Sequence, residues 1–304
     1  MERFWRTLPG TVLLVLILAI VTAAGALTLQ VHRATHPPRE TDEPRDLGAL
    51  LSQVEEVRFR SADGIELDGW LLRGEAGRAA VVLCHDLGAS KGSLVNLAIA
   101  LQKSGFTVLG FDFRGHGKSG GEGSTLGITE KRDVLGAIDY LVSLKEIETR
   151  RIGIYGVGLG AHAAVLAALD RPAAKVLVLD GLYPDVGYPL KRKVYAGWEF
   201  GVRRLGFFPR LVFRLTSQSP LENESASAVL PRLEGRDLLF VAPAGDSLLA
   251  AEMQRLYASV PEQRDAEANL ITLPATRATH LYGEELDRYN GRITEFFAKR
   301  LARR

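Results

Sequence analysis

Short apolar runs alternate with segments of helical periodicity along most of this 304-residue chain, and this alternation constrains the fold more than any other feature. The runs at 79–84 and 106–112 are almost wholly apolar, as is typical of strands covered on both faces. The alternation continues to the C-terminus and predicts a doubly wound, mostly parallel α/β sheet. Further strands are predicted at 151–156, 174–180, 237–242 and 269–273, and helices at 94–105, 130–144, 160–169, 247–259 and 284–302.

Two intervals depart from this rhythm. The segments 54–60 and 65–72 alternate polar and apolar residues around Asp63-Gly64, which predicts a hairpin and therefore an antiparallel start to a mixed sheet. Residues 181–236 hold no convincing strand between two that should be neighbours. Because a loop of that length is usually functional, we interpret it as an inserted helical cap.

The N-terminus differs from the rest of the chain. Thr11 to Leu29 carry no charge, and nineteen residues of helix span roughly 28 Å, about one bilayer core. We predict a signal-anchor transmembrane segment at 1–31, a Pro-rich and charged juxtamembrane tether at 32–53, and an extracytoplasmic body at 54–304. The alternative is a signal peptide cleaved after Ala26, which would make the protein secreted or periplasmic.

Composition excludes several classes of protein. The chain has 38 Lys and Arg against 36 Asp and Glu, a balance of +2, which argues against nucleic-acid binding. A single cysteine excludes an internal disulfide framework and a thiolate zinc site. The six histidines are too scattered for a metal cluster, so we expect neither a metal nor a cofactor.

A glycine-rich turn follows the strand at 151–156 and leads directly into a helix. Its sequence, Gly156-Val157-Gly158-Leu159-Gly160-Ala161, has the spacing of a sharp strand-to-helix turn. A dinucleotide-binding loop fits poorly, because the spacing is G-x-G-x-G and the turn lies deep in the sheet. The better match is the nucleophile elbow G-x-S-x-G, in which position 158 would be serine.

With this turn, the chain resembles the α/β-hydrolase superfamily over residues 54–304. It looks most like membrane-anchored serine hydrolases of the monoacylglycerol-lipase or serine-aminopeptidase kind. Cys84-His85-Asp86-Leu87-Gly88 resembles the oxyanion segment of that superfamily, and the segment from Asp112 to Ser119 resembles its D-x-R-G-x-G-x-S loop.

The resemblance assigns roles to individual residues. Asp246 is the expected acid, His280 the expected base, and Gly158 occupies the nucleophile position without a nucleophile. The backbone N–H groups of Leu159 and Leu87 are the expected oxyanion donors, in a segment that includes His85. Asp86 stands where glycine is usual, and whether its carboxylate points into the site is left open.

Two functions follow from these residues. In the first, the protein is catalytically degenerate and binds an apolar or acyl ligand. In the second, it is an active hydrolase of esters, acylglycerols or peptide-like substrates, in which the His280–Asp246 pair activates water or an unrecognised nucleophile. Other candidates have structural interpretations: Cys84 as a buried core residue, and His162, His116 and Arg114 as packing or bracing residues. Asp180 is an alternative acid.

The predicted cap is basic and aromatic. From Tyr188 to Arg214 the sequence has seven Lys and Arg residues and one acidic residue, Glu199. Six aromatic residues after Tyr188 are interleaved with them. On a membrane-anchored protein this pattern indicates contact with anionic lipid headgroups, or else a cap whose aromatic side chains line the pocket. Both interpretations favour an apolar or acyl ligand. The expected partners are therefore membrane lipid and such a ligand, with no nucleic acid.

Overall fold

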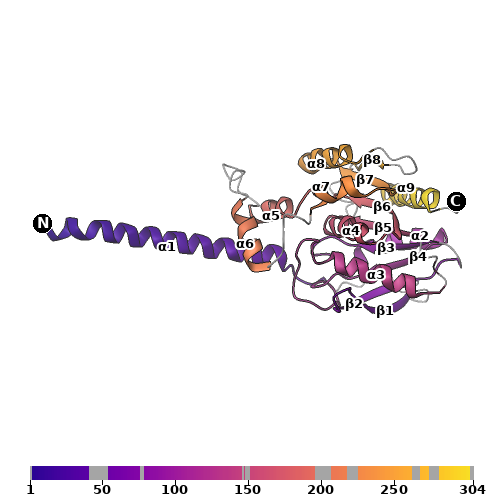
Figure 1. The fold of residues 1–304 in the computed structure, drawn as a ribbon, viewed down its shortest axis with the longest axis horizontal. Coiled ribbons are helices and arrows are strands. Elements are labelled where there is room, and N and C mark those ends of the chain that lie inside the picture. The colour runs from indigo at the N-terminus through magenta and orange to yellow at the C-terminus, as the bar shows by residue number, and fades with distance from the viewer. Residues whose placement is uncertain are drawn as a thin grey trace. The chain divides into compact units, whose positions relative to one another are not determined.

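The structure, a computed structural model, describes residues 2–40, 54–75, 79–145, 147, 151–195, 207–217, 225–261, 268–273 and 281–301 (Figure 1). The chain divides into two compact units. One comprises residues 1–35 and 187–218, and the other comprises residues 36–186 and 219–304. The predicted residues 41–53 of the tether lie outside the described part of the chain.

The larger unit is built on an eight-stranded sheet with the order β1-β2-β4-β3-β5-β6-β7-β8. Strand β2 pairs antiparallel with both β1 and β4, and all later pairs are parallel. The predicted mixed sheet with an antiparallel start is therefore confirmed. The strands are β1 Val54–Arg60, β2 Glu66–Leu72, β3 Ala80–Cys84, β4 Thr107–Phe111, β5 Ile152–Val157, β6 Ala174–Asp180, β7 Asp237–Pro243 and β8 Ala268–Leu273.

Helices cover both faces of this sheet. One face packs against helices α2 and α9, which also contact each other, and buries Leu83 with Tyr155 and Phe297. Helices α3 and α4 contact each other and cover the other face, where Gly160 of α4 lies against Cys84. The helices of this unit are α2 Val95–Lys103, α3 Lys131–Ser143, α4 Leu159–Asp170, α7 Ala226–Val229, α8 Ser247–Ala258 and α9 Gly283–Arg300, with 3₁₀ turns η2 Lys91–Leu94 and η4 Leu230–Arg232.

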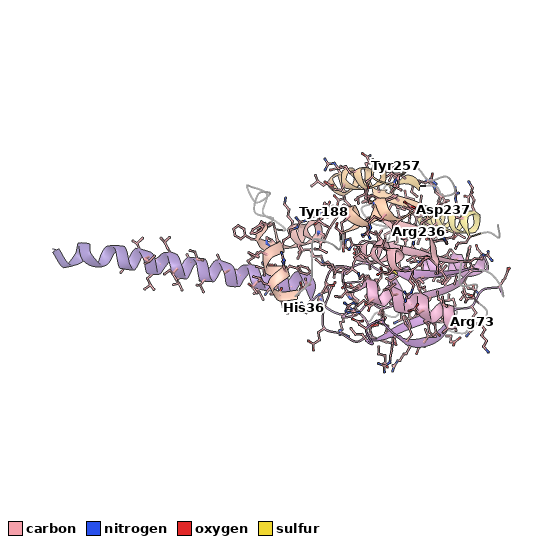
Figure 2. All side chains as sticks on the ribbon, viewed as in Figure 1. His36, Arg73, Tyr188, Arg236, Asp237 and Tyr257 are labelled. Atoms are coloured by element: carbon pink, nitrogen blue, oxygen red, sulfur yellow. The ribbon has the colours of Figure 1, made fainter. Side chains whose placement is uncertain are left out.

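Side-chain contacts attach the C-terminal helices to β7, and Asp237 and Tyr257 are labelled in Figure 2. Asp237, which begins β7, forms an ion pair with Arg300 at 3.4 Å, and both side chains are largely buried. Tyr257 of α8 packs edge-on against Phe240 of β7, with ring centroids 5.8 Å apart. These contacts join α8 and α9 to the strand that precedes the predicted acid.

The smaller unit contains helix α1, Glu2–Thr35, with α5, Gly187–Val194, and α6, Phe207–Ser217. Within residues 10–35 of α1 an 18-residue window has a mean hydropathy of 2.8, so this stretch is long and apolar enough to cross a membrane, a property that signal sequences share. The helix continues past 31, the predicted end of the anchor, to Thr35. The segment 181–236 contributes α5 and α6 to this unit, and α7 and η4 to the larger one.

Candidate functional site

The elbow lies between β5 and α4, where Gly158 caps the helix with φ +50° and ψ −105°. This backbone conformation is strained for any residue with a side chain. The Gly158 N–H donates to the Asp180 carbonyl at 2.8 Å, which fixes the turn against β6. Gly156 and Gly160 let helix and strand approach closely, because a β-carbon at either would lie closer than 3.0 Å to neighbouring backbone. The glycines therefore form the sharp turn that the sequence predicts.

The Asp86 carboxylate points into this turn. Its Oδ1 accepts one hydrogen bond from the Leu87 N–H at 2.7 Å and another from the Leu159 N–H at 3.0 Å. A β-carbon at Gly158 would lie closer than 3.0 Å to the same oxygen. The two N–H groups predicted as oxyanion donors thus converge on one point, at distances suited to an anion. The chain itself supplies the anion that occupies that point.

His85 braces the backbone of the same segment. Its ring is fully buried, with Nε2 accepting from the Phe113 N–H at 3.1 Å and Nδ1 donating to the Asp86 carbonyl at 2.8 Å. Burial lowers the pKa of His85 to about 4, and the nearby His116 adds to this lowering. The imidazole is therefore neutral near pH 7 and holds Asp86 in place through its backbone.

Leu126, which has a strained backbone, and the stacked rings of Tyr183 and His162 lie beside the elbow helix α4. Leu126 has φ +58°, the one positive value among the described non-glycine residues. Its carbonyl accepts a hydrogen bond from the Tyr183 hydroxyl at 2.7 Å. Burial raises the pKa of Tyr183, and the charge of Asp86 raises it further. Tyr183 therefore remains a neutral hydrogen-bond donor and stacks on His162 with ring centroids 4.8 Å apart.

His162 provides a test of this packing. It is fully buried, neither ring nitrogen has a hydrogen-bond partner among the described residues, and burial lowers its pKa to about 4. The unfolded chain, with a histidine pKa near 6.5, then binds more protons than the folded chain as the pH falls from 6.5 to 4, so stability is lost over that window. The measurement is the free energy of unfolding in urea at pH 7 and at pH 4.5, for the native chain and for His162→Phe. Between these two pH values the free energy of unfolding should fall in the native chain by about 2 kcal/mol more than it falls in His162→Phe. An equal loss in both would contradict this.

Two buried ion-pair networks hold the loop that follows β4. The Lys91 ammonium lies 2.7 Å from both Asp68 Oδ1 and Asp112 Oδ2 and 4.9 Å from the centre of the Trp70 ring. Burial alone would raise the pKa of Asp112, but the charge and hydrogen bonds of Lys91 lower it overall. The loop that resembles the D-x-R-G-x-G-x-S motif is thus fixed at its first residue.

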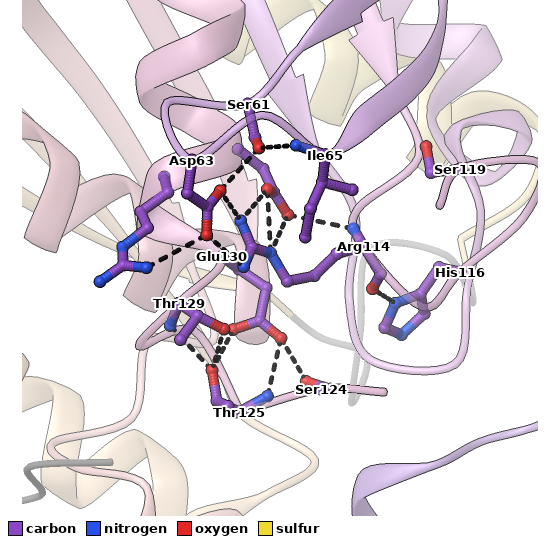
Figure 3. A network of polar contacts seen from close by, with 12 residues as sticks. Ser61, Asp63, Ile65, Arg114, His116, Ser119, Ser124, Thr125, Thr129 and Glu130 are labelled. Carbon is purple, nitrogen blue, oxygen red and sulfur yellow. Dashed lines mark hydrogen bonds and ion pairs between the residues drawn. The ribbon is translucent and has the colours of Figure 1, made fainter. Parts of the chain in front are cut away.

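Arg114 forms the centre of the second network (Figure 3). Its guanidinium donates to the buried Asp133 at 2.6 and 3.0 Å and to Asp63 at 2.7 and 3.0 Å. Nearby, the buried Glu130 accepts from the Ser124 hydroxyl at 2.6 Å and from the Thr125 N–H at 2.9 Å. These contacts support the structural role predicted for Arg114, because its guanidinium is bound by the carboxylates of Asp133 and Asp63.

Residues 36–40 of the predicted tether pack on the loops of this site. Arg39 donates to the Ser119 carbonyl at 2.7 Å and to the Gly121 carbonyl at 2.5 Å. Pro37 lies over Gly88, two residues after Asp86, and a β-carbon there would touch it at 3.4 Å. The sequence predicts a Pro-rich and charged tether at 32–53, and its residues 36–40 lie against the loops of the larger unit.

The structure describes the predicted acid, Asp246, but not the predicted base, His280. Asp246 follows β7 and caps α8, with Oδ1 accepting from the Leu249 N–H at 3.2 Å. His280 lies outside the described residues. The alternative acid Asp180 is buried and accepts hydrogen bonds from the hydroxyls of Tyr155 at 3.2 Å and Tyr289 at 2.7 Å.

Cys84 and clusters of metal-ligating side chains are the other candidates for chemistry among the described residues. Burial raises the pKa of the Cys84 thiol, so this cysteine is an unreactive core residue. Within the described ranges no three His, Cys, Asp or Glu side chains group as a metal would require. The sequence identified Asp86 as a departure but could not give its direction, and it gave no indication of the roles of Arg39 or Tyr183.

The strand order, the elbow and the converging N–H groups define an α/β-hydrolase framework. A family described as serine aminopeptidase, S33, matches residues 75–198. An esterase from Pyrococcus furiosus superposes with a TM-score of 0.67 at 22% identity, covering 88% of this chain and 98% of the esterase. The chain has the α/β-hydrolase fold, and these similarities support the membership of the α/β-hydrolase superfamily that its sequence predicts.

Similarity to curated proteins is concentrated in part of the chain. An uncharacterized protein from Mycobacterium tuberculosis is 31% identical over 178 residues, which cover 57% of this chain and 60% of that protein. A thiohydrolase from Aspergillus aculeatus is 35% identical over 126 residues, or 40% of each chain. The chain thus spans about 60% of the length of the first curated relatives it matches.

Proposed function

We propose that this protein is a membrane-anchored α/β-hydrolase-fold protein that has lost serine-hydrolase catalysis and binds an apolar or acyl ligand. The observation that carries the proposal is the pair of hydrogen bonds from Leu87 and Leu159 to Asp86 Oδ1. Gly158 supplies no hydroxyl to attack a carbonyl. Asp86 further removes the means of stabilising the charge that such an attack would create.

The position of this carboxylate opposes acyl transfer for an electrostatic reason. In acyl transfer a negative charge develops on the substrate oxygen, and backbone N–H donors stabilise it, each contributing about 3 kcal/mol. Here both donors already bind a carboxylate oxygen. A substrate oxyanion would have to displace that oxygen, or develop its charge beside a like charge.

The same contacts oppose direct water attack by a His280–Asp246 pair. That reaction also forms a tetrahedral oxyanion and needs the same two donors. Asp246 moreover accepts a hydrogen bond from the Leu249 N–H as the cap of α8. We therefore favour binding over hydrolysis.

The ligand and the membrane attachment rest on separate observations. Relatives named as an esterase and a thiohydrolase support an acyl ligand. Retention of the anchor is supported by α1, which runs unbroken through the candidate cleavage site at Ala26 to Thr35. Val31 and Ala34, near its end, are buried in the unit that α1 forms with α5 and α6. The end of the anchor is thus part of a folded unit.

The test uses the full chain in detergent micelles with a fluorescent fatty-acyl ester and a fluorophosphonate probe, which labels activated serines. We expect the ester to bind, seen as a rise in anisotropy, without release of product, and we expect no fluorophosphonate labelling. Product release that His280→Ala abolishes would overturn the proposal in favour of water activation. A chain that neither binds nor cleaves the ester would refute the acyl-ligand part alone.

A further inference from the structure

Helix α6 carries an exposed apolar face. Phe207, Phe208, Leu211 and Leu215 are all exposed, and Leu215 is 71% accessible. At 100° per residue these four side chains fall within one arc of about 100°. A contiguous apolar face of this kind on a short helix is uncommon without a partner.

The other faces of α6 carry buried and basic side chains. Pro209 and Phe213 lie on the opposite side and are buried, so α6 is already packed through a different face. Arg210 and Arg214 are exposed and border the apolar arc on one side. The helix therefore presents an apolar strip with a basic edge, the pattern of helices that lie in a membrane interface.

The neighbours of α6 indicate what covers this strip. Within the smaller unit α6 contacts α1. The α1 side chains from 10 to 26 are exposed, and burial appears only from residue 27 onward, at Val31, Ala34 and Thr35. Helix α6 thus packs against the last turns of the apolar span. If α1 crosses a bilayer, these turns lie at its boundary.

We infer that α6 is an interfacial helix, which inserts Phe207, Phe208, Leu211 and Leu215 into the bilayer surface at the end of the anchor. Arg210 and Arg214 then lie at the level of anionic headgroups. This inference rests on the membrane attachment in the proposed function and adds a second, amphipathic contact beside the transmembrane one. The contact between α6 and α1, the candidate membrane span, favours a lipid surface over a protein partner.

Depth measurements on the full chain in vesicles of phosphatidylcholine and phosphatidylglycerol test this inference. Single cysteines at Leu211→Cys and Leu215→Cys would carry an environment-sensitive dye, since the native Cys84 is buried and does not compete for the label. Thr216→Cys is the matched control, because Thr216 is exposed on the same helix outside the apolar arc. Lipids with a spin label in the acyl chain should quench positions 211 and 215 at least about twofold more than position 216.

The outcomes separate this inference from the proposed function. A dye at Ile17→Cys reports on α1 alone, because Ile17 lies in the exposed apolar span. Quenching at 17 with none at 211 or 215 would overturn the α6 inference and leave the anchor intact. Absence of quenching at 17 would refute the membrane attachment itself. An apolar dye environment at 211 without lipid quenching would show that another protein surface covers the strip, which also overturns the inference.

Discussion

Two substitutions together, Gly158→Ser and Asp86→Gly, are expected to create ester hydrolysis in this chain, whereas Gly158→Ser alone is expected to remain inactive. A serine β-carbon at position 158 would collide with Asp86 Oδ1, and the two N–H donors would still be bound to that oxygen. Asp86→Gly frees both donors and the space. Because loss of one oxyanion donor lowers kcat by ~10²–10³-fold, the double variant should exceed the single variant by at least about 10²-fold.

The measurement is turnover of a p-nitrophenyl ester by the native chain, both single variants and the double variant. The control is His280→Ala in the double variant, which should remove the gained activity if His280 is the base. The explanation fails if Gly158→Ser alone matches the double variant, because Asp86 would then not be the obstacle. It also fails if the double variant folds with unchanged stability and stays inactive.

Replacing Arg114 with alanine is expected to cause the largest loss of stability in the larger unit. The guanidinium is paired with Asp133, whose side chain is fully buried, and with Asp63. Removing one partner of a buried pair leaves an uncompensated charge and costs about 3–5 kcal/mol. The free energy of unfolding in urea should fall by that amount in Arg114→Ala.

Arg171→Ala is the matched control, since Arg171 pairs with Asp139 at 2.8 Å on the exposed surface. An exposed pair contributes about 0–1 kcal/mol, so this variant should unfold almost as the native chain does. Similar losses in the two variants would mean that burial does not determine the strength of the Arg114 network.

The sheet was predictable because its strands are recognisable locally. All five residues of β3 are buried, and its run of apolar residues is visible without any knowledge of the partners. The elbow was equally predictable, because its three alternating glycines form a tight turn in which Gly156 lets β5 approach α4 and Gly160 lets α4 approach Cys84 of β3. Local composition also identified the apolar helix at the N-terminus.

The features that a single sequence could not give depend on distant partners. The direction of Asp86 is set by Leu159, 73 residues away, which lies beside it because β3 pairs in register with β5. Arg39 binds carbonyls 80 and 82 residues away, so its segment resembles a linker in sequence and is bound in the structure. The sequence of 181–236 predicts an insertion without strands. It does not predict which helices of this segment pack with α1.

The buried position of Lys91 has a chemical consequence. An amine that is held between Asp68 and Asp112 and covered by the Trp70 ring is shielded, so acylating reagents cannot reach it in the folded state. Lys91 becomes reactive only when the sheet opens locally around the neighbouring strands β2 and β4. The rate at which Lys91 is acylated therefore reports how often this part of the sheet opens.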